Sequence, residues 1–312
     1  INEWRRFGES AAVNERFLNI TKDIYMLKTP AGGVWSGIIL IDGEEKVLID
    51  SGENAEHIDE LLVPALKELG IQLQDIAWLC NTHCHGDHVG GHSRIMKLAH
   101  PRVASYRKSV PKLQQPLKYS RLIRAVYPSY SPPAPAVLEG VKTDFILEEG
   151  DVIAGRLRLV ASPGHDDDCV CFYDIPTKTL ISGDSLQGNG TRTQGTALYM
   201  DLNAYRNTLD KLRKMDIDNI ISAHPYLFTN EMALGKQNAG VYLEKCRQIT
   251  DIYDNYISER LEEGIKNPVQ LAEGLITYMG NEMPKWLFLP LYTVNAHIQA
   301  GVKDRQGGKR TL

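Results

Sequence analysis

The chain has 312 residues, of which 43% are hydrophobic and 24% are charged, and its formal net charge is −4 at pH 7. This length is enough for one large domain or for two, and the composition is typical of a globular protein. So small a net charge does not imply a polyanionic partner for the whole surface, so a charged ligand would have to be recognised by a local patch. No stretch approaches the roughly 18 consecutive apolar residues that a membrane-spanning helix needs, so no membrane partner is expected.

The cysteine content and the first residues bear on the compartment. Five cysteines, an odd number, do not indicate a disulfide framework. The first thirty residues carry several charged side chains and no apolar segment of the kind that forms a signal peptide. We therefore expect the protein in the cytoplasm.

Short apolar runs rich in β-branched residues open the chain and indicate buried strands. Strands are predicted at 24–28, 36–41, 46–50 and 76–82. Between the last two, residues 55–69 carry apolar side chains at helical spacing and end at Gly70, a typical C-terminal cap. The strand at 76–82 leads into THCHGDHVGGH at 82–92. This order predicts an α/β fold with its chemistry at the end of a strand.

The middle of the chain is basic. Between His100 and Tyr130 there are seven cationic side chains, interleaved with tyrosines, and no acidic residue: Arg102, Arg107, Lys108, Lys112, Lys118, Arg121 and Arg124. A proline-rich stretch follows at 127–137. We interpret about 100–140 as a partly helical insertion that ends in a stiff extended segment.

Sheet character then returns, and the chain ends in helices. Strands are predicted at 156–162, 169–174, 178–184 and 219–223, and helices at 203–215, about 231–262, 267–279 and 283–299. This pattern predicts that a C-terminal helical region, 227–312, follows the part of the chain that contains the strands. The long helices after residue 231 are candidates for pairing two copies of the chain as a homodimer.

Metal-capable side chains are concentrated in six positions, 83–88. His83, His85, Asp87 and His88 lie there, and His165, Asp184 and His224 each come first after a later strand-like run. Strand ends can meet at one edge of a sheet, so all seven can converge. Imidazole and carboxylate ligands suit zinc, iron or manganese, and two ions need about six or seven ligands with one bridging carboxylate. The pattern predicts a two-metal site.

The remaining candidates near this pattern have simpler interpretations. A single histidine is usually a core or surface residue, and we interpret His57, His92, His100 and His297 in that way. Cys84 alternates away from its histidine neighbours if the backbone is extended, so we expect it beside the site and not among the ligands.

The motif order resembles that of the metallo-β-lactamase fold hydrolases. The pattern His83-x-His85-x-Asp87-His88, followed by His165, Asp184 and His224, is similar to the motifs of that family, and Asp50 in VLIDSG matches its first motif. The resemblance covers about residues 18–226 and implies that these residues form the catalytic domain. It implies an α/β fold, a four-layer αββα sandwich, with a C-terminal helical extension and metals at one edge between the sheets.

The resemblance also implies roles for these residues. His83, His85 and His165 would hold one metal, Asp87, His88 and His224 would hold the other, and Asp184 would bridge them. Asp50 would be a carboxylate behind the ligands that orients the loop.

Within the family, the ligand set resembles the glyoxalase II, lactonase and nuclease branches. Asp184 stands where one group of true β-lactamases has cysteine, and His88 fills a position that this group leaves without histidine, so antibiotic hydrolysis is not expected. Gln187 stands where the lactonases carry tyrosine, and there is no clear copy of the residues with which glyoxalase II grips glutathione.

These observations predict a metal-dependent hydrolase that cleaves a lactone, thioester or ester with a hydroxide activated by two divalent ions. Zinc is favoured, with iron or manganese open. Asp87 and Asp184 are the expected catalytic residues, Asp87 as both ligand and proton shuttle. Two alternatives are a phosphodiesterase or RNA-processing nuclease of the same fold, and a binding protein without catalysis.

The basic segment has three interpretations. It is a lid that recognises an anionic group of a small-molecule substrate, a nucleic-acid surface, or a solvated helix face. The last would have its lysines extended over a core of Leu117, Leu122, Ile123 and Val126.

Overall fold

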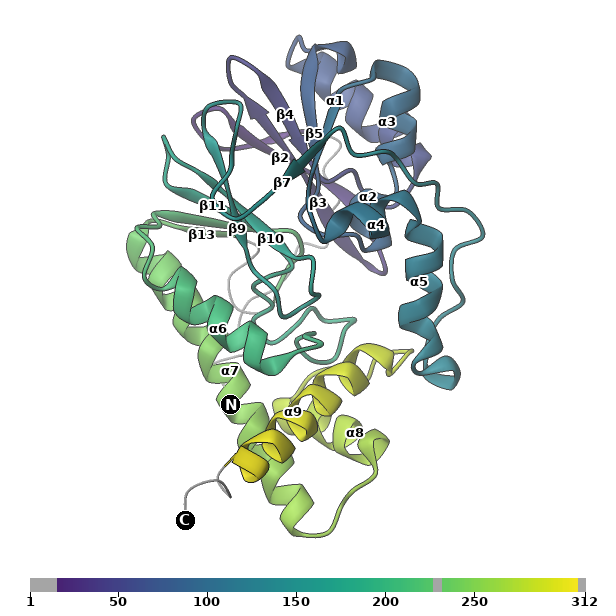
Figure 1. The fold of residues 1–312 in the computed structure, drawn as a ribbon, viewed down its shortest axis with the longest axis vertical. Helices are drawn as coiled ribbons and strands as arrows, with labels where there is room; N and C mark the ends of the chain where they lie inside the picture. The colour runs from purple at the N-terminus through teal and green to yellow at the C-terminus, as the bar shows by residue number, and fades with distance from the viewer. Residues whose placement is uncertain (1–15, 227–231, 308–312) are drawn as a thin grey trace.

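Two β-sheets face each other in the computed structural model, which describes residues 16–226 and 232–307 (Figure 1). The first sheet has seven strands in chain order: β1 Leu18–Thr21, β2 Ile24–Ala31, β3 Val34–Asp42, β4 Lys46–Ile49, β5 Ile76–Cys80, β6 Arg102–Tyr106 and β7 Phe145–Leu147. The second has six, in the order β13 Met232–Leu234, β12 Asn219–Ser222, β11 Thr179–Gly183, β10 Val170–Asp174, β9 Leu157–Ala161 and β8 Val152–Ile153. Both sheets mix parallel and antiparallel pairs.

Alternating side chains of β3 show how the layers form. Ile39 and Ile41 point into a core shared with residues of the second sheet. Ile38 and Leu40 point the other way, into a core formed with the helices that cover the first sheet. Successive strand residues face opposite sides of a sheet, so a strand buried on both sides reads as a continuous apolar run.

Helices between parallel strands cover the outer face of the first sheet. They are a π-helical turn at His57–Leu62, α1 Val63–Glu68, a 3₁₀ turn at Leu73–Asp75, α2 Gly86–Val89 and α3 His92–Ala99. The first two together occupy the helix predicted at 55–69. The crossover from β6 to β7 contains α4 Ser109–Gln114, α5 Pro116–Ala125 and a 3₁₀ turn at Pro128–Tyr130.

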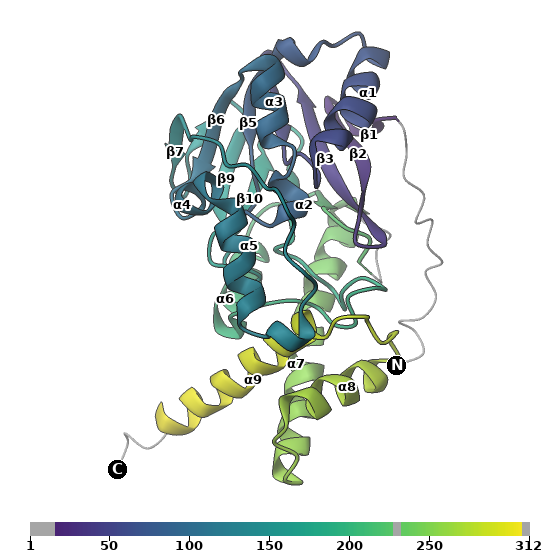
Figure 2. The same ribbon diagram turned by 90° about the vertical axis from the view of Figure 1, so that its right-hand side faces the viewer.

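The outer face of the second sheet is covered by α6 Leu202–Leu212 and α7 Lys236–Glu262, and α8 Pro268–Met279 and α9 Phe288–Gly307 pack on these helices below the sandwich (Figures 1 and 2). Residues of α6 to α9 share one core with residues of the second sheet, such as Leu180 and Ile220. The four-layer αββα sandwich with C-terminal helices is therefore confirmed.

The basic segment differs from its prediction at its start. Residues 102–106 form β6, which lies between β5 and β7 in the first sheet, so they do not belong to an insertion. Val103, Ala104 and Ser105 are buried there, but an alanine and a serine give little strand signal in the sequence. The part outside the sheet begins after Tyr106.

The C-terminal helical region also begins differently. Residues 232–234 form β13, the edge strand beside β12, and the helix predicted from about residue 231 starts at Lys236. Residue 231 itself lies outside the described residues. Gly235, with φ +89, separates strand from helix in a conformation that other residues rarely adopt. The second sheet thus extends past the boundary predicted at 226.

Two further observations concern the cysteines and the apolar length of the helices. All five cysteines are buried free thiols. No helix within the described ranges is long and apolar enough to cross a bilayer.

Candidate metal centre

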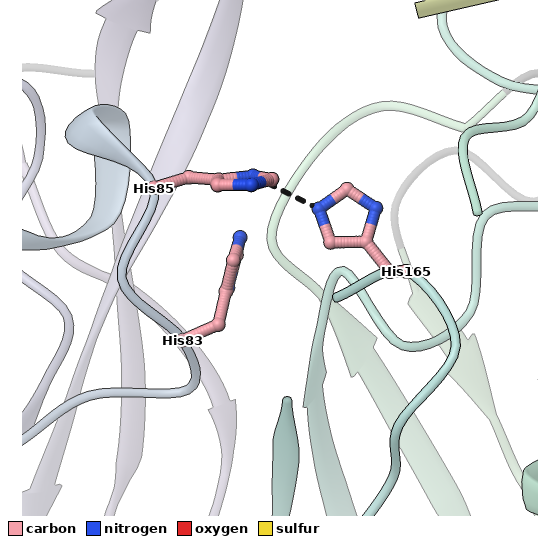
Figure 3. Close-up of side chains that lie close together, drawn as sticks. All are labelled: His83, His85 and His165. Atoms are coloured by element: carbon pink, nitrogen blue, oxygen red, sulfur yellow. Dashed lines mark hydrogen bonds between the residues drawn. The ribbon is translucent and has the colours of Figure 1, made fainter. Parts of the chain in front are cut away.

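The seven side chains predicted to bind metal follow strand ends and lie at one edge of the sandwich. His83, His85, Asp87 and His88 follow β5, His165 follows β9, Asp184 follows β11 and His224 follows β12. Figure 3 shows His83 and His85 reaching from the first half of the chain toward His165 from the second half. The site is therefore assembled across the two sheets.

The first group consists of His83, His85 and His165, which each offer a ligand atom within 4.8 Å of the others. Nδ1 of His85 lies 3.0 Å from Nε2 of His165 (Figure 3). Nε2 of His83 is buried and has no hydrogen-bond partner among the described residues. Three imidazole nitrogens thus surround one point. Three histidines are the protein ligands of many zinc sites.

The second group consists of Asp87, His88 and His224, within the same limit of 4.8 Å. Oδ2 of Asp87 lies 3.2 Å from Nε2 of His224 and 3.7 Å from Nε2 of His88. Two nitrogens and one carboxylate oxygen therefore face a second point.

Asp184 lies between the two groups. Its Oδ2 is 3.5 Å from Nε2 of His165, in the first group. Its Oδ1 is 3.5 Å from Nε2 of His224 and 3.6 Å from Nε2 of His88, in the second group. Each carboxylate oxygen faces one group, which is the arrangement that a bridging carboxylate needs.

Four of the five imidazoles are held from behind through Nδ1. The partners of Nδ1 are the hydroxyl of Thr82 for His83 at 3.1 Å, Asp50 for His88 at 2.9 Å, the carbonyl of Leu198 for His165 at 3.0 Å and the carbonyl of Trp35 for His224 at 2.6 Å. A proton on Nδ1 leaves the lone pair of Nε2 directed into the site. The four rings are therefore oriented so that Nε2 can bind a metal ion.

Asp50 is the carboxylate behind the site. Its Oδ1 accepts from the backbone N–H of Thr82 at 2.7 Å, and its Oδ2 accepts from the hydroxyl of Thr82 at 2.8 Å and from His88. Its φ of +63 is unusual for a residue other than glycine. These contacts place Asp50 behind His88 and against Thr82, the residue before His83.

The two groups differ in protonation. Burial lowers the pKa of His83 well below its usual value and that of His165 to about 4, so both rings are neutral at pH 7. Burial would lower the pKa of His88 as well, but the neighbouring carboxylates, Asp87 first, raise it to about 10. Burial would raise the pKa of Asp87, but His88 lowers it below the usual range. The second group therefore holds an imidazolium and a carboxylate.

The donor set fits divalent metal ions. Nε2 of His83 and of His88 and Oδ1 of Asp184 are buried and lack hydrogen-bond partners among the described residues. A buried polar atom left unpaired costs about 1–3 kcal/mol, and a cation would satisfy these three atoms together once the ring of His88 has lost its proton. Nitrogen and oxygen donors without thiolate suit zinc, iron or manganese.

Two neighbours interpreted as non-ligands lie outside both groups. Cys84 packs among Val89 and Leu113, and its thiol reaches the carbonyl of Ser109 at 3.5 Å. His92 is buried, with Nδ1 2.7 Å from the hydroxyl of Ser51.

Gln187 and Tyr226 are neighbours of the site for which the sequence predicted no contact. Nε2 of Gln187 donates to the hydroxyl of Tyr226 at 2.8 Å and to the carbonyl of Asp184 at 3.2 Å. Oε1 of Gln187 accepts from the backbone N–H of Leu198 at 3.2 Å. Gln187 therefore supports the Asp184 loop from within the protein, where the lactonases carry tyrosine. The only signal for Tyr226 is its place two residues after His224.

The cations of the basic segment have different partners. Arg102 pairs with Glu45, Arg107 pairs with Glu148, and Lys112 contacts three consecutive aspartates, Asp166, Asp167 and Asp168. The predicted apolar core under this helix is wrong in part, because Leu122 and Val126 are 57% and 56% exposed. Lys118 and Arg121 line an outward groove of about 510 Å³ beside α5.

Arg124, also in α5, is partly buried and does not line this groove. Its Nη1 donates to the carbonyl and hydroxyl of Ser120 at 3.0 and 2.6 Å, and its Nε is buried without a partner among the described residues. The guanidinium lies 5.9 Å from the ring centre of Phe288 in α9. Burial lowers the pKa of Arg124, while the carboxylates of Asp87 and Glu53 act in the opposite direction. Its charge is therefore within electrostatic reach of the second metal group.

Two facing sheets with imidazole and carboxylate donors at one edge define the αββα class of metal-binding folds. A model of the metallo-beta-lactamase superfamily matches residues 29–224, more than half of the chain, and the chain belongs to that superfamily. Its fold family binds divalent metal ions, and the clusters described above fit such ions.

Curated relatives are similar at low identity. The chain is 25% identical over 242 residues to the lactamase-like protein notP of Aspergillus sp. (strain MF297-2), covering 77% of this chain and 64% of that protein. It is 27% identical over 227 residues to an atrochrysone carboxyl ACP thioesterase of Emericella nidulans, covering 72% and 61%. It is 26% identical over 191 residues to a beta-lactamase-like protein 2 homolog of Caenorhabditis elegans, covering 60% and 54%. The chain thus spans less than two thirds of each.

Solved structures share the fold. A metallo-beta-lactamase family protein of Thermus thermophilus superposes with a TM-score of 0.71 at 18% identity, covering 91% of this chain and 94% of that one. A subclass B3 metallo-beta-lactamase of Bradyrhizobium japonicum gives a TM-score of 0.55 at 18% identity, covering 81% and 97%. At these identities the similarity concerns the architecture.

Proposed function

We propose that the protein is a metal-dependent hydrolase of acyl bonds, with thioesters as the leading substrates and lactones and esters as the related ones. The observation that carries the proposal is the convergence of seven nitrogen and oxygen donors into two groups that share Asp184. The thioesterase of Emericella nidulans, whose name records this activity, supports the choice of thioester.

The two groups would hold two divalent ions, with zinc favoured and iron or manganese the alternatives. His83, His85 and His165 would hold one ion, Asp87, His88 and His224 the other, and Asp184 would contact both. Bound ions of this kind supply Lewis acidity and lower the pKa of a coordinated water from 15.7 to near 7.

Asp87 is the residue of the chain best placed to move a proton. Its side chain is 32% exposed, whereas that of Asp184 is 9% exposed, so Asp87 is the carboxylate that a substrate can approach. Nε2 of His224 fixes its Oδ2 from one side at 3.2 Å. We assign Asp87 the transfer of a proton through this carboxylate, in addition to its part in the ligand set.

Arg124 is the residue that we assign to substrate recognition. Its positive charge interacts with the carboxylate of Asp87, in the second group, and its Nε has no partner among the described residues. A guanidinium is suited to hold a carboxylate or a phosphate. The preferred substrate would therefore carry an anionic group on its acyl or leaving part.

Elemental analysis followed by a substrate panel tests this proposal. The purified protein is measured for metal content and then assayed on thioesters, lactones, esters, bis-p-nitrophenyl phosphate and β-lactams. We expect up to two ions per chain and turnover of thioesters that a chelator abolishes.

Three results would contradict the proposal. Turnover that is insensitive to the chelator would exclude a metal-dependent reaction. Faster cleavage of the phosphodiester would favour the nuclease alternative. Full metal content without turnover of any class would favour a binding protein.

A further inference from the structure

His85 differs from the other four imidazoles of the site in the way its ring is held. The others direct Nε2 inward and are held through Nδ1, whereas His85 directs Nδ1 toward Nε2 of His165 at 3.0 Å. Its Nε2 therefore points away from the group, and it is buried without a hydrogen bond to any described residue. A metal ligand usually donates its second ring N–H to a fixed acceptor. Such an acceptor has to be sought behind His85.

Asp166 occupies that place. Its Oδ2 lies 3.5 Å from Nε2 of His85, slightly beyond hydrogen-bond distance, and the side chain is 6% exposed. It follows His165 directly in the chain, so the loop that delivers one ligand of the group also delivers the carboxylate behind another. A small rotation of the His85 ring would bring the N–H onto this oxygen.

Two residues of the basic segment hold Asp166. Nζ of Lys112, in α4, lies 2.7 Å from Oδ1 of Asp166, and the hydroxyl of Tyr119, in α5, donates to Oδ2. The ring of Tyr119 also stacks on the ring of His85, with centroids 6.2 Å apart and planes 13° apart. Lys112 in turn lies 4.3 Å from the ring centre of Tyr119. One network thus fixes both the carboxylate and the face of the imidazole.

The three aspartates of this network do not form a cation site of their own. Nζ of Lys112 lies 2.7 Å from Asp166, 2.6 Å from Asp167 and 2.7 Å from Asp168, so an ammonium already occupies the point that their oxygens share. The lysine neutralises part of their charge and keeps Asp166 directed at His85.

From these contacts we infer that Asp166, held by Lys112 and Tyr119, is a positioning residue that fixes His85 with Nδ1 directed into the first metal group. In this way the segment between β6 and β7 takes part in building the metal site. The inference rests on the metal centre but needs no particular substrate.

Binding of Co²⁺ to the metal-free protein, followed by its d–d absorption and by competition with a chelator, tests this inference. We expect Asp166→Asn to weaken binding at the first group about 10- to 100-fold, the range for partners behind a metal ligand, and to leave the second group unchanged. Asp167→Asn is the matched control, because Asp167 touches the same Lys112 but is 65% exposed. It should bind both ions like the wild type.

Two further variants separate positioning from general stability. Tyr119→Phe keeps the stacked ring and removes the hydroxyl, so we expect a smaller loss than for Asp166→Asn. Asp166→Glu should restore part of the affinity, because it returns a carboxylate to the same side of His85.

A second measurement, by NMR, observes the imidazole ring of His85 directly. In the Zn²⁺-loaded protein with ¹⁵N-labelled histidine, His85 should show a protonated Nε2 in the wild type and an altered Nε2–H resonance in Asp166→Asn. Wild-type Co²⁺ affinity in Asp166→Asn, an equal loss in Asp167→Asn, or an unchanged Nε2–H resonance would each overturn the inference. None of these measurements involves turnover, so a failure of the proposed hydrolase activity would not be mistaken for them.

Discussion

Oδ2 of Asp50 lies 2.9 Å from Nδ1 of His88 and joins the end of β4 to the second metal group. The same carboxylate receives the backbone N–H and the hydroxyl of Thr82, directly before the first ligand of the chain. Asp50 thus connects two neighbouring strand ends, and the relative placement of the two metal groups depends on it.

Asp50→Ala is expected to lower metal affinity at the second group by about 10- to 100-fold, because the ring of His88 loses its acceptor. It should also lower the free energy of unfolding by about 1–3 kcal/mol, since the buried N–H of Thr82 is left unpaired. Titration with Zn²⁺ against a chelator and denaturation of the metal-free protein measure the two effects.

Asp23→Ala provides the control for backbone conformation. Asp23 also has a positive φ, +66, but lies on the turn between β1 and β2, away from the metal groups. It should alter stability without altering metal affinity. Equal loss of metal affinity in both variants would show that the positive φ, and not the contact with His88, is responsible.

Single substitutions in the two groups should remove different ions. His165→Ala removes a donor of the first group and His224→Ala removes a donor of the second, so each variant should retain about one ion per chain. The carboxylate of Asp184 faces both groups, so Asp184→Ala should retain less metal than either of these two variants. Elemental analysis after dialysis gives the counts, with His100→Asn as the control. Full metal content in Asp184→Ala would contradict its shared position.

The strands and the convergence of the seven donor side chains were predictable because their signals are local. β2 and β3 are largely buried, and each contains an apolar run, IYML at 24–27 and GIILI at 37–41. The seven donors combine specific residue types with positions after such runs, and this combination rarely arises from packing alone. β6 and β13 gave weaker signals, because one contains alanine and serine and the other has three residues.

The network behind His85 had no local signal. Tyr119 and Asp166 are 47 positions apart in the sequence and meet only because α5 packs against the loop after β9. The roles of the cations in the basic segment are set in the same way, since Arg121 is exposed beside the outward groove and Arg124 is partly buried. Composition identified a basic segment, and only tertiary packing decided that Lys112 supports a ligand loop while Arg107 pairs with Glu148 on the surface.

Metal uptake by the second group should release protons. The pKa of His88 in the metal-free protein is raised to about 10, so the ring is protonated at pH 6–8 and must lose its proton to become a ligand. Apparent affinity should therefore rise with pH, by about tenfold per unit for each proton released, and continue to rise up to the raised pKa. Calorimetry in buffers of different ionisation enthalpy counts the protons. Affinity that does not change between pH 6 and 8 would contradict the ion pair inferred for this group.

Arg124 should decide between anionic and neutral substrates. Arg124→Gln removes the charge that lies within reach of Asp87 and should lower kcat/KM for a thioester with a terminal carboxylate by about 10- to 100-fold, the value of a charge-assisted hydrogen bond of roughly 1.5–3 kcal/mol. The uncharged thioester of the same length should lose far less. Arg121→Gln removes an equal charge from the outward groove of the same helix and serves as the matched control. Equal losses for both substrates, or the same selectivity change in Arg121→Gln, would show that Arg124 does not bind the anionic group.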